Sequence, residues 1–231
     1  MRKTPRVASN GAPDGTRRRI ARLTVSDLSN LRYETPAAPM HIGALVIVEA
    51  PALLDADGQL RLNEVRRRIE LRLPRVPVLR RRLFRPGLFR GRALWVDEEQ
   101  FDIARHVREV ILSPSAGDAE LLEAAERLMG VLLDRTRPLW ELWFITQRGR
   151  DRIAIVVKLH HAVADGRAAV AMLSSLFDLR ADEPDPAPCE WSPEPVPPVW
   201  SLLADNVQGK VRAMQQVGRV LAHPLRAASA S

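Results

Sequence analysis

The sequence predicts an α/β (α+β) fold in which a mixed sheet is flanked by helices and followed by a proline-rich linker and a C-terminal amphipathic helix. Short apolar segments rich in β-branched residues predict strands, and apolar residues that recur every three to four positions predict helices between them. With 231 residues, 46% of them hydrophobic, the chain has enough apolar side chains for a core, which excludes wholly disordered proteins. The predicted strands are 42–48, 139–147 and 153–159, and the predicted helices are 63–73 and 118–132.

The first predicted strand, 42–48, is an almost continuous apolar segment between His41 and Glu49. Strands that are covered on both faces have this pattern, whereas half-exposed strands alternate apolar and polar residues. We therefore expect this strand to be buried on both faces.

Two amphipathic helices follow. The first has an apolar residue at every fourth position among arginines and ends at Pro74, so its arginine face should be exposed to solvent. The second begins at Asp118, with Ser115 three residues earlier as a candidate capping residue. Its apolar face consists of Leu121, Leu122, Ala125, Leu128, Met129 and Leu132.

Strands 139–147 and 153–159 are separated by the short polar segment 148–151, which predicts a hairpin. The second of these strands leads directly into the sequence His160-His161-Ala-Val-Ala-Asp165-Gly166, after which a helical pattern begins. A polar connection between an apolar strand and a helix is where functional sites are commonly built. We therefore expect the site at residues 160–166.

The chain divides into four predicted regions: a flexible basic arm (1–20), a folded body (21–181), a proline-rich linker (182–198) and an amphipathic helix with a tail (199–231). The arm is rich in Arg, Pro, Gly and Asn without apolar periodicity. The linker contains seven prolines, which exclude a helix or an inner strand. The helix aligns Leu203, Val207, Val211, Met214, Val217 and Leu221.

The net charge of +7 comes mainly from the arm and from an arginine patch at 61–92, where twelve arginines face two glutamates. The patch contains no aromatic residue except Phe84 and Phe89, so few side chains could stack on nucleic-acid bases. We therefore expect no nucleic-acid partner. Three alternatives remain for Arg80, Arg81 and Arg82: CoA phosphates, anionic lipid or solvent.

The single cysteine, Cys189, excludes a disulfide framework and a cysteine-based zinc site. No apolar segment has the length of a signal peptide core or of a membrane span. We therefore expect a cytoplasmic protein whose contact with membranes or lipid inclusions is peripheral.

Strand alternation predicts that His161 lies on the same face as Leu159 and the apolar residues before it, whereas His160 lies on the opposite face with Lys158. The two histidines should therefore point apart and not share a metal ion, so we expect no metal site. Burial of His161 would lower its pKa and leave a neutral nitrogen that can act as a general base. The alternative is a core histidine bonded to a backbone carbonyl.

The complete string His-His-x-x-x-Asp-Gly resembles the acyltransferase signature of the chloramphenicol acetyltransferase-like superfamily, which includes peptide-synthetase condensation domains. Within this superfamily the chain is similar to the bacterial wax ester synthase/diacylglycerol acyltransferase family. Further segments that carry the resemblance lie between residues 23 and 142 in the family's order. They are Leu23-Thr-Val-Ser-Asp-Leu28 with Glu34, Pro39-Met-His-Ile-Gly-Ala44, Phe101-Asp-Ile-Ala-Arg-His-Val107 and Arg137-Pro-Leu-Trp-Glu-Leu142.

The resemblance implies an O-acyltransferase that moves a fatty acyl group from acyl-CoA, its co-substrate, to diacylglycerol or a long-chain alcohol without any other cofactor. It implies His161 as the general base, His160 as a positioning residue, and a structural Asp165 whose carboxylate pairs with an arginine. Gly166 would allow a close approach of backbone and substrate. Pro138, Leu139 and Trp140 would shape or support the acyl site, and a strand-core role for Trp140 is the alternative.

The resemblance also implies a half of the chloramphenicol acetyltransferase-like sandwich, because family members continue into a second αβ half that supplies much of the acyl-CoA channel. Residues 21–181 would be the N-terminal acyltransferase half-domain. We therefore expect exposed apolar surface on strand 42–48 or on helix 199–223, and activity that requires another polypeptide. The alternative is a non-catalytic remnant or partner subunit that binds lipid or a full-length relative.

Overall fold

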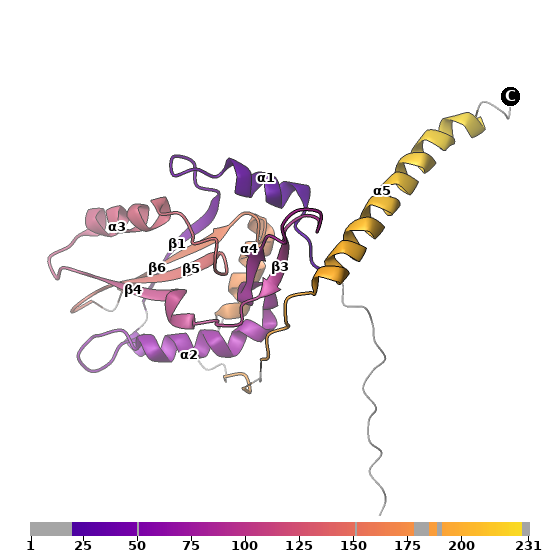
Figure 1. Ribbon diagram of the computed structural model, residues 1–231. Coiled ribbons are helices and arrows are strands. Elements are labelled where there is room, and N and C mark those ends of the chain that lie inside the picture. Colours follow the sequence, from indigo (N-terminus) through magenta and orange to yellow (C-terminus); the bar gives the residue numbers. More distant parts are fainter. Residues whose placement is uncertain (1–19, 50, 151, 178–184, 189–190, 228–231) are drawn as a thin grey trace, which may run out of the picture.

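The structure is a computed structural model that describes residues 20–49, 51–150, 152–177, 185–188 and 191–227. The predicted arm, except Ile20, and parts of the linker lie outside the described residues. Figure 1 shows an αβ body from which one long helix projects. The helices are α1 (Val25–Tyr33), α2 (Leu62–Arg72), α3 (Asp118–Gly130), α4 (Gly166–Leu176) and α5 (Val199–Ala227), and the strands are β1 (His41–Glu49), β2 (Arg81–Phe84), β3 (Leu94–Asp97), β4 (Val107–Leu112), β5 (Trp140–Gln147) and β6 (Arg152–His160).

The main sheet has the strand order β1-β6-β5-β4, and a second, two-stranded sheet pairs β2 with β3. β1 and β5 run antiparallel to β6, while β4 runs parallel to β5. The sheet is therefore mixed, which confirms the predicted fold class, and the β5–β6 hairpin is confirmed as well. The connection that closes this hairpin contains Gly149 with a φ of 77°, which glycine adopts without a steric penalty.

The core lies on both faces of β6 because successive side chains of a strand point to opposite faces. Ile153, Ile155, Val157 and Leu159 pack into one apolar cluster with residues of α2 and α4, whereas Ala154 and Val156 pack under α3. Figure 1 shows α2 and α3 on opposite sides of the sheet. The alternation predicted for this strand is confirmed.

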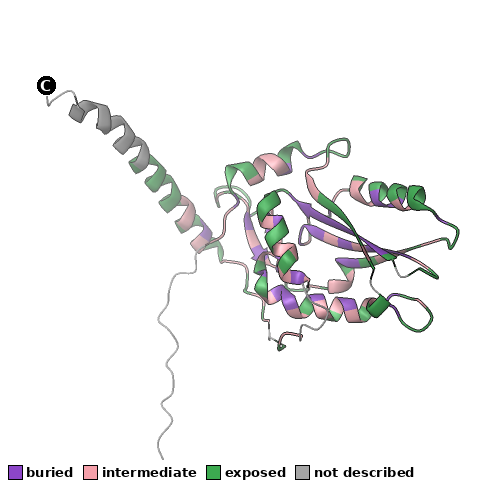
Figure 2. Cartoon of the chain, turned by 180° about the vertical axis from the view of Figure 1, so that it is seen from behind, coloured by how far each residue is buried: buried purple, intermediate pink, exposed green. Residues whose placement is uncertain are grey.

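The expectation that strand 42–48 is covered on both faces is wrong. β1 is an edge strand that pairs with β6 alone, and the middle of the strand is open to solvent. Leu45, Val46 and Ile47 are 37%, 45% and 47% exposed. Figure 2 shows this exposure along the strand. The described part of the chain therefore leaves the middle of this apolar strand open on both faces, while Ile42 and Val48 at its ends pack against the core.

Helix α3 differs from its prediction in three details, the first being that it ends at Gly130, so Leu132 follows the helix. The Glu120 carboxylate accepts a hydrogen bond from the backbone N–H of Gly117, so the N-terminal cap comes from Glu120 and not from Ser115. Leu122 is exposed, and Ala124 takes the buried position. The face that meets the sheet is formed by Leu121, Ala124, Ala125, Leu128 and Met129, which pack with Ile145, Ala154 and Val156.

Helix α5 touches the body through its first two turns, where Leu202 packs against Leu94 and Val96 of β3 and Asp205 pairs with Arg22. Beyond that point the helix projects away from the body (Figure 1), and the aligned apolar residues Leu203, Val207, Val211 and Met214 are exposed. The exposed apolar surface that we expected on strand 42–48 or on helix 199–223 is therefore present on both β1 and α5. Among the described helices, none combines the length and apolar content needed to cross a membrane.

Candidate active site

The predicted junction between strand and helix is confirmed, since β6 ends at His160 and α4 begins at Gly166. Three backbone hydrogen bonds fix the start of the connecting loop. His160 N–H donates to Leu139 O (3.0 Å), His161 N–H donates to Met40 O (2.9 Å), and Val163 N–H donates to His160 O (2.9 Å). The loop is thus bonded to the residues that precede β1 and β5.

The two histidines point apart, but their environments are the reverse of what we expected from strand alternation. The His160 ring is fully buried, whereas His161 is exposed. The apolar face of β6 ends at Leu159 because strand pairing stops at His160, and the chain then turns so that Ala162 takes the next buried position. The expected burial of His161 is therefore wrong, and so is the argument that burial prepares it as a base.

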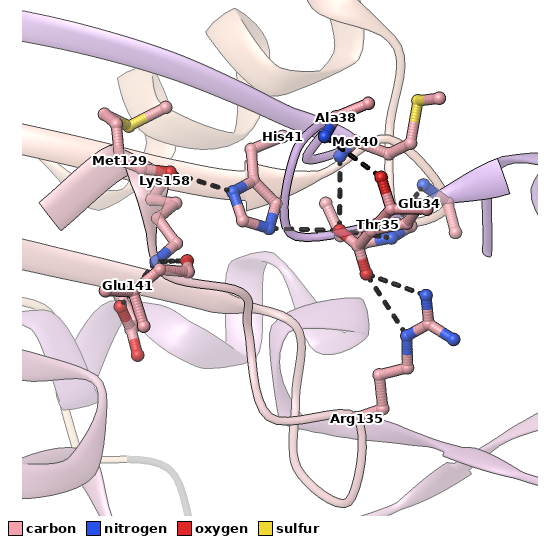
Figure 3. Close-up of polar contacts among 12 residues, drawn as sticks. Glu34, Thr35, Ala38, Met40, His41, Met129, Arg135, Glu141 and Lys158 are labelled. Atoms are coloured by element: carbon pink, nitrogen blue, oxygen red, sulfur yellow. Dashed lines mark hydrogen bonds and ion pairs between the residues drawn. The ribbon is translucent and has the colours of Figure 1, made fainter. Parts of the chain in front are cut away.

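Glu34 is the centre of a buried polar cluster behind the loop (Figure 3). Its side chain is fully buried, and Arg135 donates two hydrogen bonds to Oε2, from Nε (3.2 Å) and Nη2 (2.8 Å). Oε1 accepts a hydrogen bond from Met40 N–H (3.2 Å) and lies 3.2 Å from His41 Nε2 and 3.4 Å from His160 Nε2. One carboxylate therefore joins α1, the start of β1, the end of β6 and the segment before β5.

The charge states in this cluster follow from burial and from the hydrogen bonds. Burial works to raise the pKa of Glu34, but the hydrogen bonds from Arg135 and from Met40 outweigh it, so the pKa lies below its ordinary value. Burial lowers the pKa of His160 from 6.5 to about 4, against the opposing effect of Glu34. His160 is therefore neutral at neutral pH, beside an ionised carboxylate.

The tautomer of His160 can be assigned from its donors. The backbone N–H of Ala162 donates to His160 Nδ1 (2.9 Å), so Nδ1 carries no proton and the proton of the neutral ring is on Nε2. Nε2 faces Glu34 at ion-pair distance without meeting hydrogen-bond geometry. The imidazole thus holds the loop at Ala162 through one nitrogen and faces the carboxylate through the other.

The C-terminal end of α3 meets His41 of this cluster and the buried side chain of Lys158. Lys158 Nζ donates to the carbonyls of Leu128 (3.0 Å) and Val131 (2.5 Å), and it lies 3.3 Å from Glu141 Oε2. His41 Nδ1 lies 3.4 Å from the carbonyl of Met129. Cations and donors satisfy the last carbonyls of a helix, so both residues have a structural role here.

Pro138, Leu139 and Trp140 are all buried. Leu139 belongs to a small core that includes Ala162 of the loop. Trp140 Nε1–H donates to Leu79 O (2.7 Å), and its ring stacks on His106, whose ring stacks on Phe101 in turn. Two of the segments that carry the family resemblance therefore pack directly against each other. Trp140 is a core residue of the strand in this structure.

Asp165 is the N-cap of α4, and its carboxylate accepts a hydrogen bond from Ala168 N–H (2.8 Å). No arginine within the described ranges forms an ion pair with it, so the expected arginine pair is not found; the helix N-terminus is its partner instead. A Cβ atom added to Gly166 would meet no atom within 4 Å, so the described chain itself does not require glycine there.

The described residues contain no group of three or more His, Cys, Asp or Glu side chains that could hold a metal ion. Cys189 lies outside the described residues. A hollow of about 600 Å³ lies between β3, the linker and the first turns of α5, with Trp95 and Trp200 among its walls. None of its lining residues belongs to residues 160–166.

The sequence profile of the "Wax ester synthase/diacylglycerol acyltransferase catalytic domain" matches residues 23–230. The "Probable diacyglycerol O-acyltransferase tgs3" of Mycobacterium tuberculosis H37Rv is 34% identical over 185 residues, which are 80% of this chain and 66% of the relative. The "Putative diacyglycerol O-acyltransferase Rv1760" of the same strain is 33% identical over 170 residues, which cover 73% of this chain and 33% of the relative.

Among solved structures, the "Wax ester synthase/diacylglycerol acyltransferase from Marinobacter aquaeolei VT8" is similar with a TM-score of 0.58 and 27% identity. The match covers 78% of this chain and 40% of that protein. The first condensation domain of the calcium-dependent antibiotic synthetase has a TM-score of 0.52 at 17% identity, which shows a shared fold. The match to this chain thus covers 66% of the first mycobacterial relative and 33% of the second. The extent of the profile match shows that the chain belongs to the wax ester synthase/diacylglycerol acyltransferase catalytic-domain family.

Proposed function

We propose that this chain is the histidine-bearing part of an acyl-CoA-dependent O-acyltransferase that forms triacylglycerol or wax esters. The observation that carries the proposal is the exposed His161 at the end of β6, held at its backbone by Met40 and backed by a buried polar cluster. The names of the relatives support the same reaction, since they are called diacyglycerol O-acyltransferases. Fatty acyl-CoA would be the donor, and diacylglycerol or a long-chain alcohol the acceptor.

In this reaction His161 is the general base. Its neutral imidazole takes the proton of the acceptor hydroxyl while the hydroxyl oxygen attacks the thioester carbonyl carbon. The new C–O bond forms, and the C–S bond of the tetrahedral intermediate then breaks. The CoA thiolate leaves and takes the proton back from the imidazolium. No covalent acyl-enzyme forms, so one base serves both proton transfers.

The neighbouring residues have supporting roles in this proposal. His160 positions the loop through its bond to Ala162, and Asp165 holds the start of α4. Gly166 leaves room for a substrate beside the loop. Pro138, Leu139 and Trp140 support the acyl site from the core side, because Leu139 packs against Ala162.

The substrate channel requires a second polypeptide in this proposal. The described chain leaves apolar surface uncovered on β1 and α5, and the hollow of about 600 Å³ is not lined by the loop. A channel for acyl-CoA would form when another polypeptide covers these surfaces. The same observation favours one alternative, a non-catalytic partner subunit that binds lipid or a full-length relative. In either case we place the protein in the cytoplasm, in peripheral contact with membranes or lipid inclusions.

The test is an assay of acyl-CoA consumption with hexadecanol and with diacylglycerol, for this chain alone and mixed with a polypeptide that corresponds to the remaining part of a relative. We expect turnover in the mixture and its loss in His161→Ala. Arg167→Ala is the control, because this exposed arginine lies on α4 beside the same loop. A mixture that remains active with His161→Ala would contradict the assignment of the base. A mixture that binds lipid without turnover would support the partner subunit.

A further inference from the structure

The loop that connects β2 to β3 presents two large apolar side chains to solvent. Leu88 is 85% exposed and Phe89 is 84% exposed, the highest values among the exposed large hydrophobic residues of the described chain. Residues 85–92, which we call the hairpin tip, contain both. Large apolar side chains exposed in this way mark contact sites for membranes or proteins.

The backbone of the hairpin tip is held in this arrangement. Phe89 has a φ of 64°, a left-handed conformation that bulky residues rarely adopt, between Gly87 and Gly91 with φ values of 84° and 87°. Asn206 Nδ2 of α5 donates a hydrogen bond to Phe89 O (2.8 Å). The φ of Gly91 favours glycine there, and a Cβ atom at this position would also lie 2.8 Å from the guanidinium of Arg22. The fold itself therefore keeps Leu88 and Phe89 outside the core.

Part of the arginine patch is neutralised by carboxylates of the protein. Arg67 and Arg68 pair with Glu64. Arg81 pairs with Asp97, Arg82 pairs with Glu98, and the guanidinium of buried Arg80 stacks on Trp191. The alternatives of CoA phosphates or lipid for residues 80–82 therefore lose their main support.

Three further arginines of the patch lie at the hairpin tip. Arg85, Arg90 and Arg92 are exposed, and no carboxylate of the described ranges pairs with them. Lys210 is also exposed and follows Asn206 by one helical turn, so it lies on the side of α5 that meets the tip. Two exposed apolar side chains thus share the hairpin tip with three arginines, and Lys210 is on the side of α5 that meets the tip.

We propose that the hairpin tip docks on the surface of a bilayer that contains anionic phospholipids. Leu88 and Phe89 insert at the boundary between headgroups and acyl chains, while Arg85, Arg90, Arg92 and Lys210 bind headgroup phosphates. Apolar insertion combined with electrostatic attraction is how peripheral proteins bind anionic membranes. A nucleic acid would match the cations but offers no apolar layer for Leu88. The inference names the lipid-binding element of the proposed enzyme, yet its test does not depend on catalysis.

The test is co-sedimentation of the purified chain with phosphatidylcholine vesicles, with and without phosphatidylglycerol. We expect binding to the anionic vesicles that weakens with salt. The substitutions R85Q/R90Q/R92Q should weaken this binding by about a hundredfold, because each cation near an anionic surface contributes about fivefold. L88S/F89S should weaken it by about tenfold or more, since the apolar side chains no longer leave water. Circular dichroism checks that each variant is folded.

Matched variants elsewhere on the surface serve as controls. I111S/L122S removes two exposed apolar side chains and R148Q/R150Q/R167Q removes three exposed arginines, all outside the hairpin tip. Both should bind the anionic vesicles like the original chain, and so should His161→Ala. Equal binding to neutral and anionic vesicles, or binding that L88S/F89S leaves unchanged, would overturn the proposal. Loss of activity in His161→Ala with intact vesicle binding would separate catalysis from docking.

Discussion

Oε1 of Glu34 lies 3.4 Å from Nε2 of His160, and both side chains are fully buried. The two residues are far apart in the sequence, and they meet because β1 pairs with β6 in a register that places His41 opposite His160. The carboxylate is ionised and the imidazole is neutral. The loop that carries His161 therefore has a fixed polar support on its core side.

Replacing Glu34 by Gln should destabilise the protein by about 1 to 3 kcal/mol, because Arg135 and His160 then lose a buried charged partner. Glutamine keeps the shape of the side chain, so the change in the free energy of unfolding measures the contribution of the negative charge. Urea denaturation measures it. Glu49→Gln is the control, since Glu49 is exposed at the other end of β1, and its stability should change by less than about 0.5 kcal/mol. Equal stability of the two variants would contradict the role of Glu34.

The stability of the protein should fall as pH decreases from 6.5 to about 4. In this interval His160 takes up a proton in the unfolded chain but not in the folded protein, so protons favour unfolding. The shift corresponds to about 3 kcal/mol in total. Urea denaturation across the interval measures this slope, and His160→Gln should make it shallower. His41 and His106, whose pKa values are also lowered chiefly by burial, contribute in the same direction, so some slope should remain. An unchanged slope in His160→Gln would contradict a neutral His160.

Trp140→Phe should lower the free energy of unfolding by about 1 to 3 kcal/mol. The variant leaves Leu79 O without its buried donor and removes part of the stack with His106. Thermal or urea denaturation measures the change. Trp200→Phe is the matched control, because Trp200 is 71% exposed and the same substitution there should change stability by less than about 0.5 kcal/mol. A small effect at Trp140 would mean that the stack contributes little.

Asp165→Ala should cost about 1 kcal/mol of stability through loss of the α4 N-cap, whereas Asp165→Asn should retain most of it, since asparagine caps helices equally well. Denaturation of the two variants side by side measures the difference. If Asn were as destabilising as Ala, the negative charge and not the cap would be what matters, as in the arginine pair that the family resemblance implies.

Local patterns in the sequence were sufficient to predict β6, its hairpin with β5, and the loop at 160–166. Each of these depends on residues that are close in the sequence and on strand alternation. The strands β2 and β3 have four residues each, too few to show a period, and no strand was predicted there. The burial of His161 was predicted wrongly because alternation holds only while strand pairing continues.

The polar cluster around Glu34 could not be derived from local patterns. Glu34 and Arg135 are 101 positions apart, and only the pairing of β1 with β6 brings the cluster together. Glu34 lies within the segments that carry the family resemblance, but the resemblance implies no role for it. The sequence offers one signal for it: Glu34 is an isolated carboxylate, because residues 35–40 carry no charge.

The open edge of β1 has a consequence for how the chain behaves at high concentration. Edge strands of globular proteins usually carry a charge, a proline or a bulge that prevents a further strand from adding. β1 has none of these between His41 and Glu49, and its middle residues are Leu45, Val46 and Ile47. The unprotected edge is therefore a template for intermolecular strand addition, and the chain depends on a cover over β1 to avoid aggregation.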